Sequence, residues 1–190
     1  MEKKLSEMSL KELWKLFPIE LSISRNEWKT YYQELENDLI SWLSPYSDMR
    51  ISHIGSTAIR DIKAKNIIDV LIEFPAGTDL LSRAKVLEKH DCIIMNVSEN
   101  RVSLNRGYTS NGFAEKVYHI HLRYIGDNDE LYFRDYLNQF HETAKKYECL
   151  KEKLAVSYRN DRDRYTEEKG VFIKQVTQKA KKIYGAKYEK

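Results

Sequence analysis

Large apolar residues recur at helical spacing near the start of the chain. Between Trp28 and Leu43 they stand three or four positions apart, and Pro45 follows them. This spacing predicts an amphipathic helix that ends before the proline. Ser24-Arg25-Asn26-Glu27 has the form of a capping box at the start of that helix. A shorter helix is predicted upstream, at about residues 10–17.

The pattern changes to that of β-strands from about residue 49 onward. Runs rich in apolar, β-branched and aromatic residues predict strands at about residues 49–53, 66–74, 92–97, 101–108 and 116–125. A helix at about residues 80–87 follows the second strand, and the third and fourth strands form a hairpin. After residue 127 the pattern is again helical, with helices at about residues 130–139, 141–158 and 163–184 and Gly185 as a stop.

This order of elements predicts a single α+β domain over residues 1–190. We expect a mixed or antiparallel sheet flanked by helices over about residues 19–126, followed by a helical tail over about residues 127–190. A chain of 190 residues is long enough for one domain with its own core.

Composition limits where the protein is expected to act. No run of about eighteen apolar residues occurs, so no membrane-spanning helix is expected. The first residues carry acids and lack an apolar segment, so we expect no secretory signal and a cytoplasmic location. Cys92 and Cys149 show no metal or redox spacing, and we interpret both as reduced thiols in or near the core.

Positive charge gathers in the second half of the chain. The whole chain has a net charge of +3, whereas residues 134–190 hold 15 Lys and Arg against 9 Asp and Glu. A basic tail can meet nucleic acid or an anionic ligand. We interpret it mainly as a solvated helical face of mixed charge, and a nucleic-acid partner is not expected because helix packing explains the spacing of its tyrosines.

Asp69 is an acid inside a run that otherwise has the pattern of a buried strand. A buried carboxylate is costly unless it is paired, hydrogen-bonded or bound to a metal. Strand alternation places Asp69 and Glu73 on one face and Val70 and Ile72 on the other, core-facing side. Asp69 therefore faces water, a ligand or an ion, or it accepts hydrogen bonds from the amides of a nearby loop. Glu73 is roughly 13 Å from Asp69, too far to share an ion.

A Gly-Ser-Thr turn precedes this strand. Gly55 lets the backbone approach a ligand closely, and Ser56 and Thr57 offer hydroxyl groups and amides to a phosphate. A Gly-Ser turn followed by a strand acid is typical of the nucleotidyltransferase fold, in which the serine and loop amides hold a triphosphate and strand carboxylates hold Mg²⁺. The turn therefore favours a phosphate-binding role.

A second set of polar residues follows the strand at residues 116–125. His119, His121 and Arg123 share one face of it, and Arg106 ends the preceding strand and could extend a basic lining. These residues suit an anion or a metal, although the histidines could also be simple surface residues. We hypothesise that Asp69 with His119 or His121 binds one divalent metal, Mg²⁺ or Mn²⁺ with Zn²⁺ as a further option.

Several separated motifs together resemble the GrpB family, whose members look like minimal nucleotidyltransferase-fold proteins. The motifs are "HIGSTA", "AKNIIDVLIE", "RGYTSNGFAEKVYHIHLRYIGDNDELYFRDYL" and "YECLKEKLA", followed by "DRDRYTEEKGVFI". The resemblance covers about residues 19–184. The family's motif positions correspond here to His53, Gly55, Ser56, Thr57, Lys65, Asp69, Arg106, Gly107, His119, His121, Phe133, Arg134, Asp135, Tyr136, Tyr147, Leu150, Lys151, Tyr165 and Lys169.

Two departures from that family's pattern affect the interpretation. Ile59-Arg60-Asp61-Ile62 stands where a Val-Pro-Gly-Leu turn is usual. Leu71 stands where active nucleotidyltransferases commonly carry a second acid, two residues after the first. A two-metal site built on this strand is therefore not expected.

Two functions remain open from the sequence. In the first, Asp69, Ser56, His119 and His121 transfer a nucleotidyl group from a nucleotide to a small acceptor. The ligand phosphates would then be bound by Gly55, Ser56, Thr57, Lys65, Arg106, Arg123 and Arg134. In the second, the chain is a non-catalytic module that binds a nucleotide or a CoA-like anion and acts through a partner, as a related domain fused to dephospho-CoA kinase in some bacteria suggests.

The sequence leaves the substrate, the acceptor and the oligomeric state open. The expected partner is a nucleotide or another phosphate-bearing small molecule. Lys151 and Lys169 are interpreted as ordinary surface lysines of the tail, whereas Arg134 is favoured as functional because it follows the end of a strand.

Overall fold

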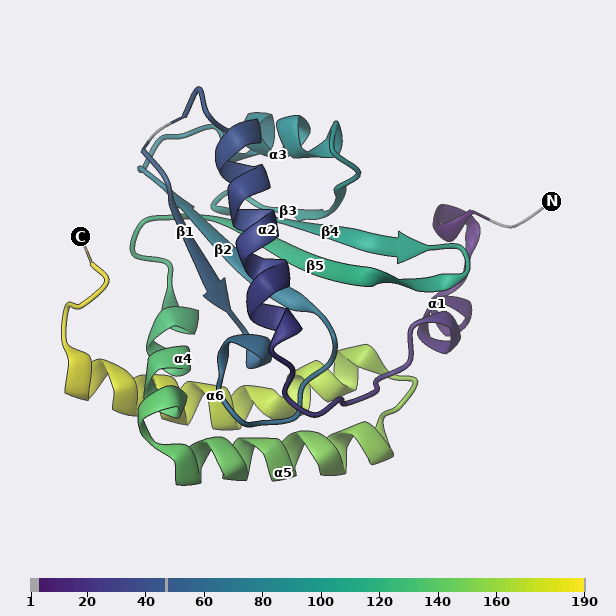
Figure 1. Ribbon diagram of the computed structural model, residues 1–190, viewed down its shortest axis with the longest axis vertical. Helices are drawn as coiled ribbons and strands as arrows, with labels where there is room; N and C mark the ends of the chain where they lie inside the picture. The colour runs from purple at the N-terminus through teal and green to yellow at the C-terminus, as the bar shows by residue number, and fades with distance from the viewer. Residues whose placement is uncertain (1–3, 47, 190) are drawn as a thin grey trace.

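A computed structural model describes residues 4–46 and 48–189 (Figure 1). Residues 1–3, 47 and 190, which the expected domain 1–190 includes, lie outside the described residues. The helices are α1 (Leu10–Leu16), α2 (Glu27–Trp42), α3 (Leu80–Glu88), α4 (Asp129–Gln139), α5 (His141–Ser157) and α6 (Arg162–Tyr184), with short 3₁₀ turns at Leu5–Glu7 and Ser56–Ala58. The strands are β1 (Arg50–Ile54), β2 (Ile68–Phe74), β3 (Ile93–Val97), β4 (Arg101–Thr109) and β5 (Gly112–Tyr124).

The five strands form one mixed sheet in the order β1-β2-β5-β4-β3. β2 and β5 pair in parallel, and the other neighbours pair antiparallel. The α+β class with a mixed sheet and a helical tail is thus confirmed. The parallel pair at the centre brings the strand that holds Asp69 beside the strand that holds both histidines, with Asp69 in register with His119.

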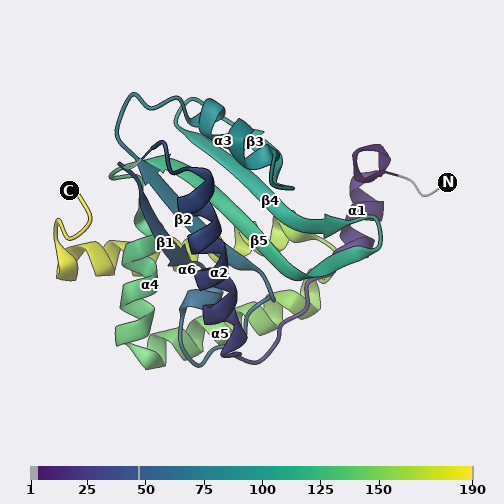
Figure 2. The same ribbon diagram turned by 45° about the horizontal axis from the view of Figure 1, so that its top comes forward.

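Helices α2 and α3 cover one face of the sheet. Trp28 and Leu39 of α2 pack there against Val70 and Ile120, all of them buried. Figure 2 shows α2 crossing this face, while α6 lies on the other side of the sheet. α2 begins at Glu27, and its cap residue makes no side-chain hydrogen bond, so the capping box expected from Ser24 does not form.

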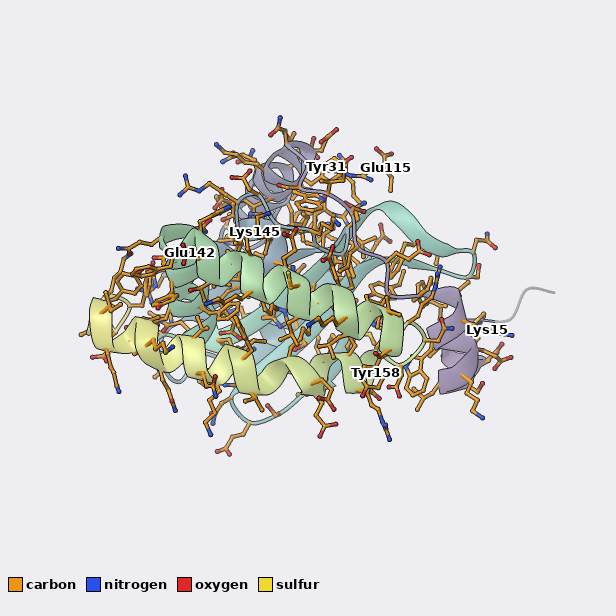
Figure 3. All side chains as sticks on the ribbon, turned by 90° about the horizontal axis from the view of Figure 1, so that it is seen from below. Lys15, Tyr31, Glu115, Glu142, Lys145 and Tyr158 are labelled. Carbon is orange, nitrogen blue, oxygen red and sulfur yellow. The ribbon has the colours of Figure 1, made fainter. Side chains whose placement is uncertain are left out.

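The tail helices cover the opposite face. Leu131 of α4 packs on Ile54 and Leu71, and α5 and α6 lie side by side beneath the sheet, with Tyr158 near the turn between them (Figure 3). Leu71 and Glu73 are completely buried. The face that carries Asp69 is therefore largely covered by helices, because the tail folds back over it.

The remaining sequence expectations have mixed outcomes. Cys92 is buried as expected, whereas Cys149 is exposed on α5. Among residues 4–46 and 48–189, no helix has the length and apolar character needed to cross a membrane.

Glu73 anchors the covered face, which generates a stability prediction. Its Oε1 accepts hydrogen bonds from Arg50 at 2.7 Å and from Asn128 at 2.8 Å. Glu73→Ala leaves both donors without this acceptor, so the free energy of unfolding should fall by about 2–3 kcal/mol. Chemical denaturation measures this change. Glu99→Ala, at an exposed position in the β3–β4 turn, should change stability by less than about 0.5 kcal/mol; equal effects for the two variants would contradict the anchoring role.

Candidate functional site

A cavity of about 680 Å³ lies between α6 and the sheet. Its walls come from the turn after β1, the start of β2, the middle of β5, the start of α4, the middle of α5 and one side of α6. The polar residues that matter most here are Ser56, Lys65, Asp69, His119, Arg162 and Lys169. Residues from both halves of the chain thus meet on one enclosed surface.

The Gly-Ser turn packs directly on the strand acid. Gly55 has φ +70°, and a Cβ atom at this position would lie 2.2 Å from Oδ2 of Asp69. Glycine is therefore needed both for the left-handed backbone and for the close approach of the carboxylate. The next residue, Ser56, lines the cavity together with Tyr147 of α5.

Asp69 begins a chain of hydrogen bonds that runs away from the turn. Its Oδ1 lies 3.1 Å from Nδ1 of His119 and 3.8 Å from Nε2 of His121. Burial raises the pKa of Asp69, but the hydrogen bond with His119 and the nearby imidazole of His121 outweigh it and hold the pKa well below its usual value. Asp69 is therefore a carboxylate and acts only as an acceptor.

His119 passes this chain on to Tyr108 and Arg162. Burial lowers the pKa of His119, which favours the neutral ring. Its Nδ1–H then donates to Asp69, and its Nε2 accepts from the Tyr108 hydroxyl, which lies 2.7 Å away. Nη2 of Arg162 donates to the same hydroxyl oxygen at 2.9 Å. Each donor in this chain therefore has an acceptor: Arg162 donates to Tyr108, Tyr108 to His119, and His119 to Asp69.

These contacts do not fit a metal site as the side chains stand. Within residues 4–46 and 48–189, no three His, Cys, Asp or Glu side chains are grouped so that they could hold a metal ion. Oδ1 of Asp69 faces the two imidazoles, and Oδ2 packs against Gly55. The carboxylate and imidazole atoms that could bind a metal therefore contact one another rather than surround a common ion position. The divalent metal stays a prediction from the sequence.

Five lysines line the cavity, and three of them, Lys65, Lys151 and Lys169, have lowered pKa values. Burial, together with the charges of Arg162 and Lys169, lowers the pKa of Lys65 to about 7. Burial, with Lys169 nearby, lowers the pKa of Lys151 to about 7, and burial lowers that of Lys169 to about 8. Nζ of Lys169 lies 4.3 Å from the centre of the Tyr165 ring, and Nζ of Lys65 lies 5.7 Å from it.

The carboxylates near these lysines are engaged elsewhere. Asp129 forms an ion pair with Lys181, and Glu130 forms one with Arg123 at 3.2 Å. Asp69 is held by the histidines. Among the described residues, no carboxylate forms an ion pair with Lys65, Lys151 or Lys169, so this part of the cavity carries excess positive charge.

The tail contributes more to this site than the sequence indicated. Lys151 and Lys169 were expected on the surface, but Lys151 is buried and both line the cavity. Arg162 and Tyr108 were not singled out for the site at all. The available signal was the spacing of Arg162, Tyr165 and Lys169, which stand on one side of a helix.

Four of the expected ligand-binding residues do not line the cavity. Thr57 is buried and donates to the carbonyl of Ile67. Arg123 is on the expected strand face, but its guanidinium pairs with Asp127 and Glu130.

Two further arginines are also held elsewhere. Arg134 donates to the carbonyl of His53 at 2.8 Å and pairs with Asp135. Arg106 lies on the α2 face of the sheet, 3.8 Å from Asp38 and above the ring of Trp42. Its expected place in the lining is corrected, because it pairs across the sheet with Tyr118, whose side chain belongs to the α2 core.

The mixed sheet, the Gly-Ser turn beside a strand acid and the helical cover define a nucleotidyltransferase-like fold. A solved structure of a cytoplasmic RNA terminal U-transferase shares this fold, with a TM-score of 0.51 and 12% identity over 75% of this chain and 42% of that chain. The family described as GrpB protein matches residues 18–179. The chain belongs to the GrpB family.

Individual relatives agree with this assignment. Glutamate-rich protein GrpB of Alkalihalophilus pseudofirmus is 31% identical over 78% of this chain and 88% of that protein. YqkA of Bacillus subtilis is 29% identical over 91% of this chain, which spans only 51% of that relative. The crystal structure of GrpB from Enterococcus faecalis has a TM-score of 0.72 and 24% identity, and the match covers 87% of this chain and 99% of that one.

The contact between Gly55 and Asp69 can be tested by adding one methyl group. Gly55→Ala should lower the free energy of unfolding by more than about 2 kcal/mol, because the left-handed backbone alone costs roughly 1–2 kcal/mol and the Cβ atom also meets the carboxylate. Gly77→Ala is the matched control, since Gly77 has φ +85° with no atom within 4 Å of the added Cβ. If thermal denaturation shows the same loss of stability for both variants, the close approach of Gly55 to Asp69 does not contribute to the free energy of unfolding.

Proposed function

We propose that the cavity binds a nucleotide or another small phosphate-bearing molecule through Lys65, Lys151 and Lys169. The observation that supports this most directly is a group of cations that line one cavity and form no ion pair with any carboxylate in the described part of the chain. Buried charges of one sign destabilise a fold unless an opposite charge arrives. A bound phosphate supplies that opposite charge.

The surrounding groups suit the oxygen atoms of a phosphate. Lysine donates as a point charge, and the planar guanidinium of Arg162 can donate to two oxygens of one phosphate. Gly55 brings backbone close to the cavity, and Ser56 adds a hydroxyl group. A small phosphate ester available in the cytoplasm is the class of ligand that these donors fit.

Transfer of a nucleotidyl group to a small acceptor is the second candidate. It is favoured by His119, whose ring is held by Asp69 in the orientation that a general base needs. Leu71 in place of a second acid favours a binding module that acts through a partner instead. Release of pyrophosphate from a nucleoside triphosphate supports transfer, and binding without release supports the module.

Removal of one cation should weaken binding of a phosphate probe. Lys169→Met should reduce the affinity for pyrophosphate and for ATP by about tenfold or more, because a hydrogen bond from a charged group contributes about 1.5–3 kcal/mol. Isothermal titration calorimetry measures the affinities. Lys146→Met removes the same charge from an exposed position on α5 and should leave both unchanged. The proposal fails if wild-type protein binds neither probe, or if the two variants bind equally.

Affinity and stability should depend on pH in opposite directions. Because the lysine pKa values lie at about 7 to 8, a rise in pH through this range removes their charges and should weaken pyrophosphate binding. In the unfolded chain the same lysines keep their protons up to about pH 10. The unfolded state therefore binds more protons above about pH 7, and the ligand-free protein should become more stable as pH rises towards 10. Titration calorimetry and denaturation across this range test both signs; a common direction would contradict the assigned lysines.

A further inference from the structure

We propose that this cavity takes its phosphate ligand in the metal-free form, with Lys65, Lys169 and Arg162 supplying the positive charge that a metal ion would otherwise bring. This inference rests on the proposed function and names the ionic form of its ligand: a di- or triphosphate that is not complexed with a divalent cation. It is an alternative to the metal site expected from the sequence, so one experiment separates the two.

Neither oxygen of Asp69 is free to bind a metal ion. Proteins that bind a metal-phosphate complex usually supply one or two carboxylate oxygens to the ion. Oδ1 of Asp69 lies 3.1 Å from Nδ1 of His119, and Oδ2 packs against Gly55. A metal ion at Asp69 would have to break the contact with His119, whose Nε2 also accepts a hydrogen bond from the Tyr108 hydroxyl. The carboxylate thus acts as an internal anchor for the histidine.

The charge around the proposed phosphate position is already positive. Lys65, Lys169 and Arg162 line the cavity, and Lys151 is buried beside Tyr147 and donates to the carbonyl of Lys63. A triphosphate without metal carries enough negative charge to offset these four cations. A divalent cation would add like charge to the same enclosed space, where Coulomb repulsion is screened less than in water.

His121 does not complete a metal site either. Nε2 of His121 lies 3.8 Å from Oδ1 of Asp69, while its Nδ1 is buried and has no hydrogen-bond partner among the described residues. The ring therefore presents one nitrogen to the carboxylate and the other to a different side. The His121 ring therefore does not surround a common metal position with Asp69 and His119. This agrees with the absence of a group of three possible metal ligands in the described part of the chain.

The test compares binding of pyrophosphate and of ATP with and without divalent cations. Titration calorimetry is run on wild-type protein in EDTA, and then with excess Mg²⁺, Mn²⁺ or Zn²⁺. The proposal predicts that both probes bind in EDTA, and that each cation leaves the apparent affinity unchanged or weakens it by drawing off free probe. Binding that appears only when a divalent cation is present would overturn the inference and leave the proposed function standing.

For Asp69→Asn, metal-free binding and metal-dependent binding predict opposite changes in phosphate affinity. Asparagine keeps an acceptor for His119 but loses the negative charge, so the proposal predicts phosphate affinity that is unchanged or a few-fold tighter in EDTA. A metal ligand at this position predicts a loss of tenfold or more instead. Lys169→Met should weaken binding in EDTA by tenfold or more, and Lys146→Met controls for net charge.

The wild-type comparison needs no substitution, so the inference stays testable even if Asp69→Asn does not fold. If neither probe binds under any condition, the proposed function and this inference both fall. That result differs from cation-dependent binding, which rejects the metal-free form alone.

Discussion

The rest of the site depends on the way the charge of Asp69 is satisfied. Its carboxylate is fixed between Gly55 and the imidazole of His119. Its charge raises the pKa of Lys65 and Lys169, but less than burial lowers them, and it forms no ion pair with either. Lys65 and Lys169 then face an enclosed space without a carboxylate partner among the described residues. A fold that tolerates this arrangement holds electrostatic energy that an anionic ligand can release.

The sheet and the helical tail supply different parts of this site. The parallel pairing of β2 with β5 sets Asp69 beside His119, and the antiparallel pairing of β1 with β2 brings Gly55, just after β1, onto the carboxylate. The cations come mostly from the tail, more than eighty residues further along the chain. Because α6 runs across the open part of that sheet face, one helix can place Arg162, Tyr165 and Lys169 along the cavity.

Sequence patterns predicted the elements well and the site only in part. Strand alternation correctly placed Asp69 on the opposite face of β2 from Val70 and Ile72. Every second residue of this strand packs into the core under α2. The same alternation places Arg106 in the row of Val102 and Leu104, which explains why Arg106 lies on the α2 face. Whether the tail would cover the other face depends on long-range packing, which no local pattern encodes, and the roles of Lys151 and Lys169 follow from that packing.

The most direct test of the central claim is to measure the pKa of each cavity lysine by NMR, with lysine labelled at Cε. The account predicts that Lys65 and Lys151 titrate near 7 and Lys169 near 8. Saturating pyrophosphate should then raise all three values towards the ordinary lysine value of about 10.4. Cavity lysines that titrate near 10.4 without ligand, or that do not respond to pyrophosphate, would contradict the account.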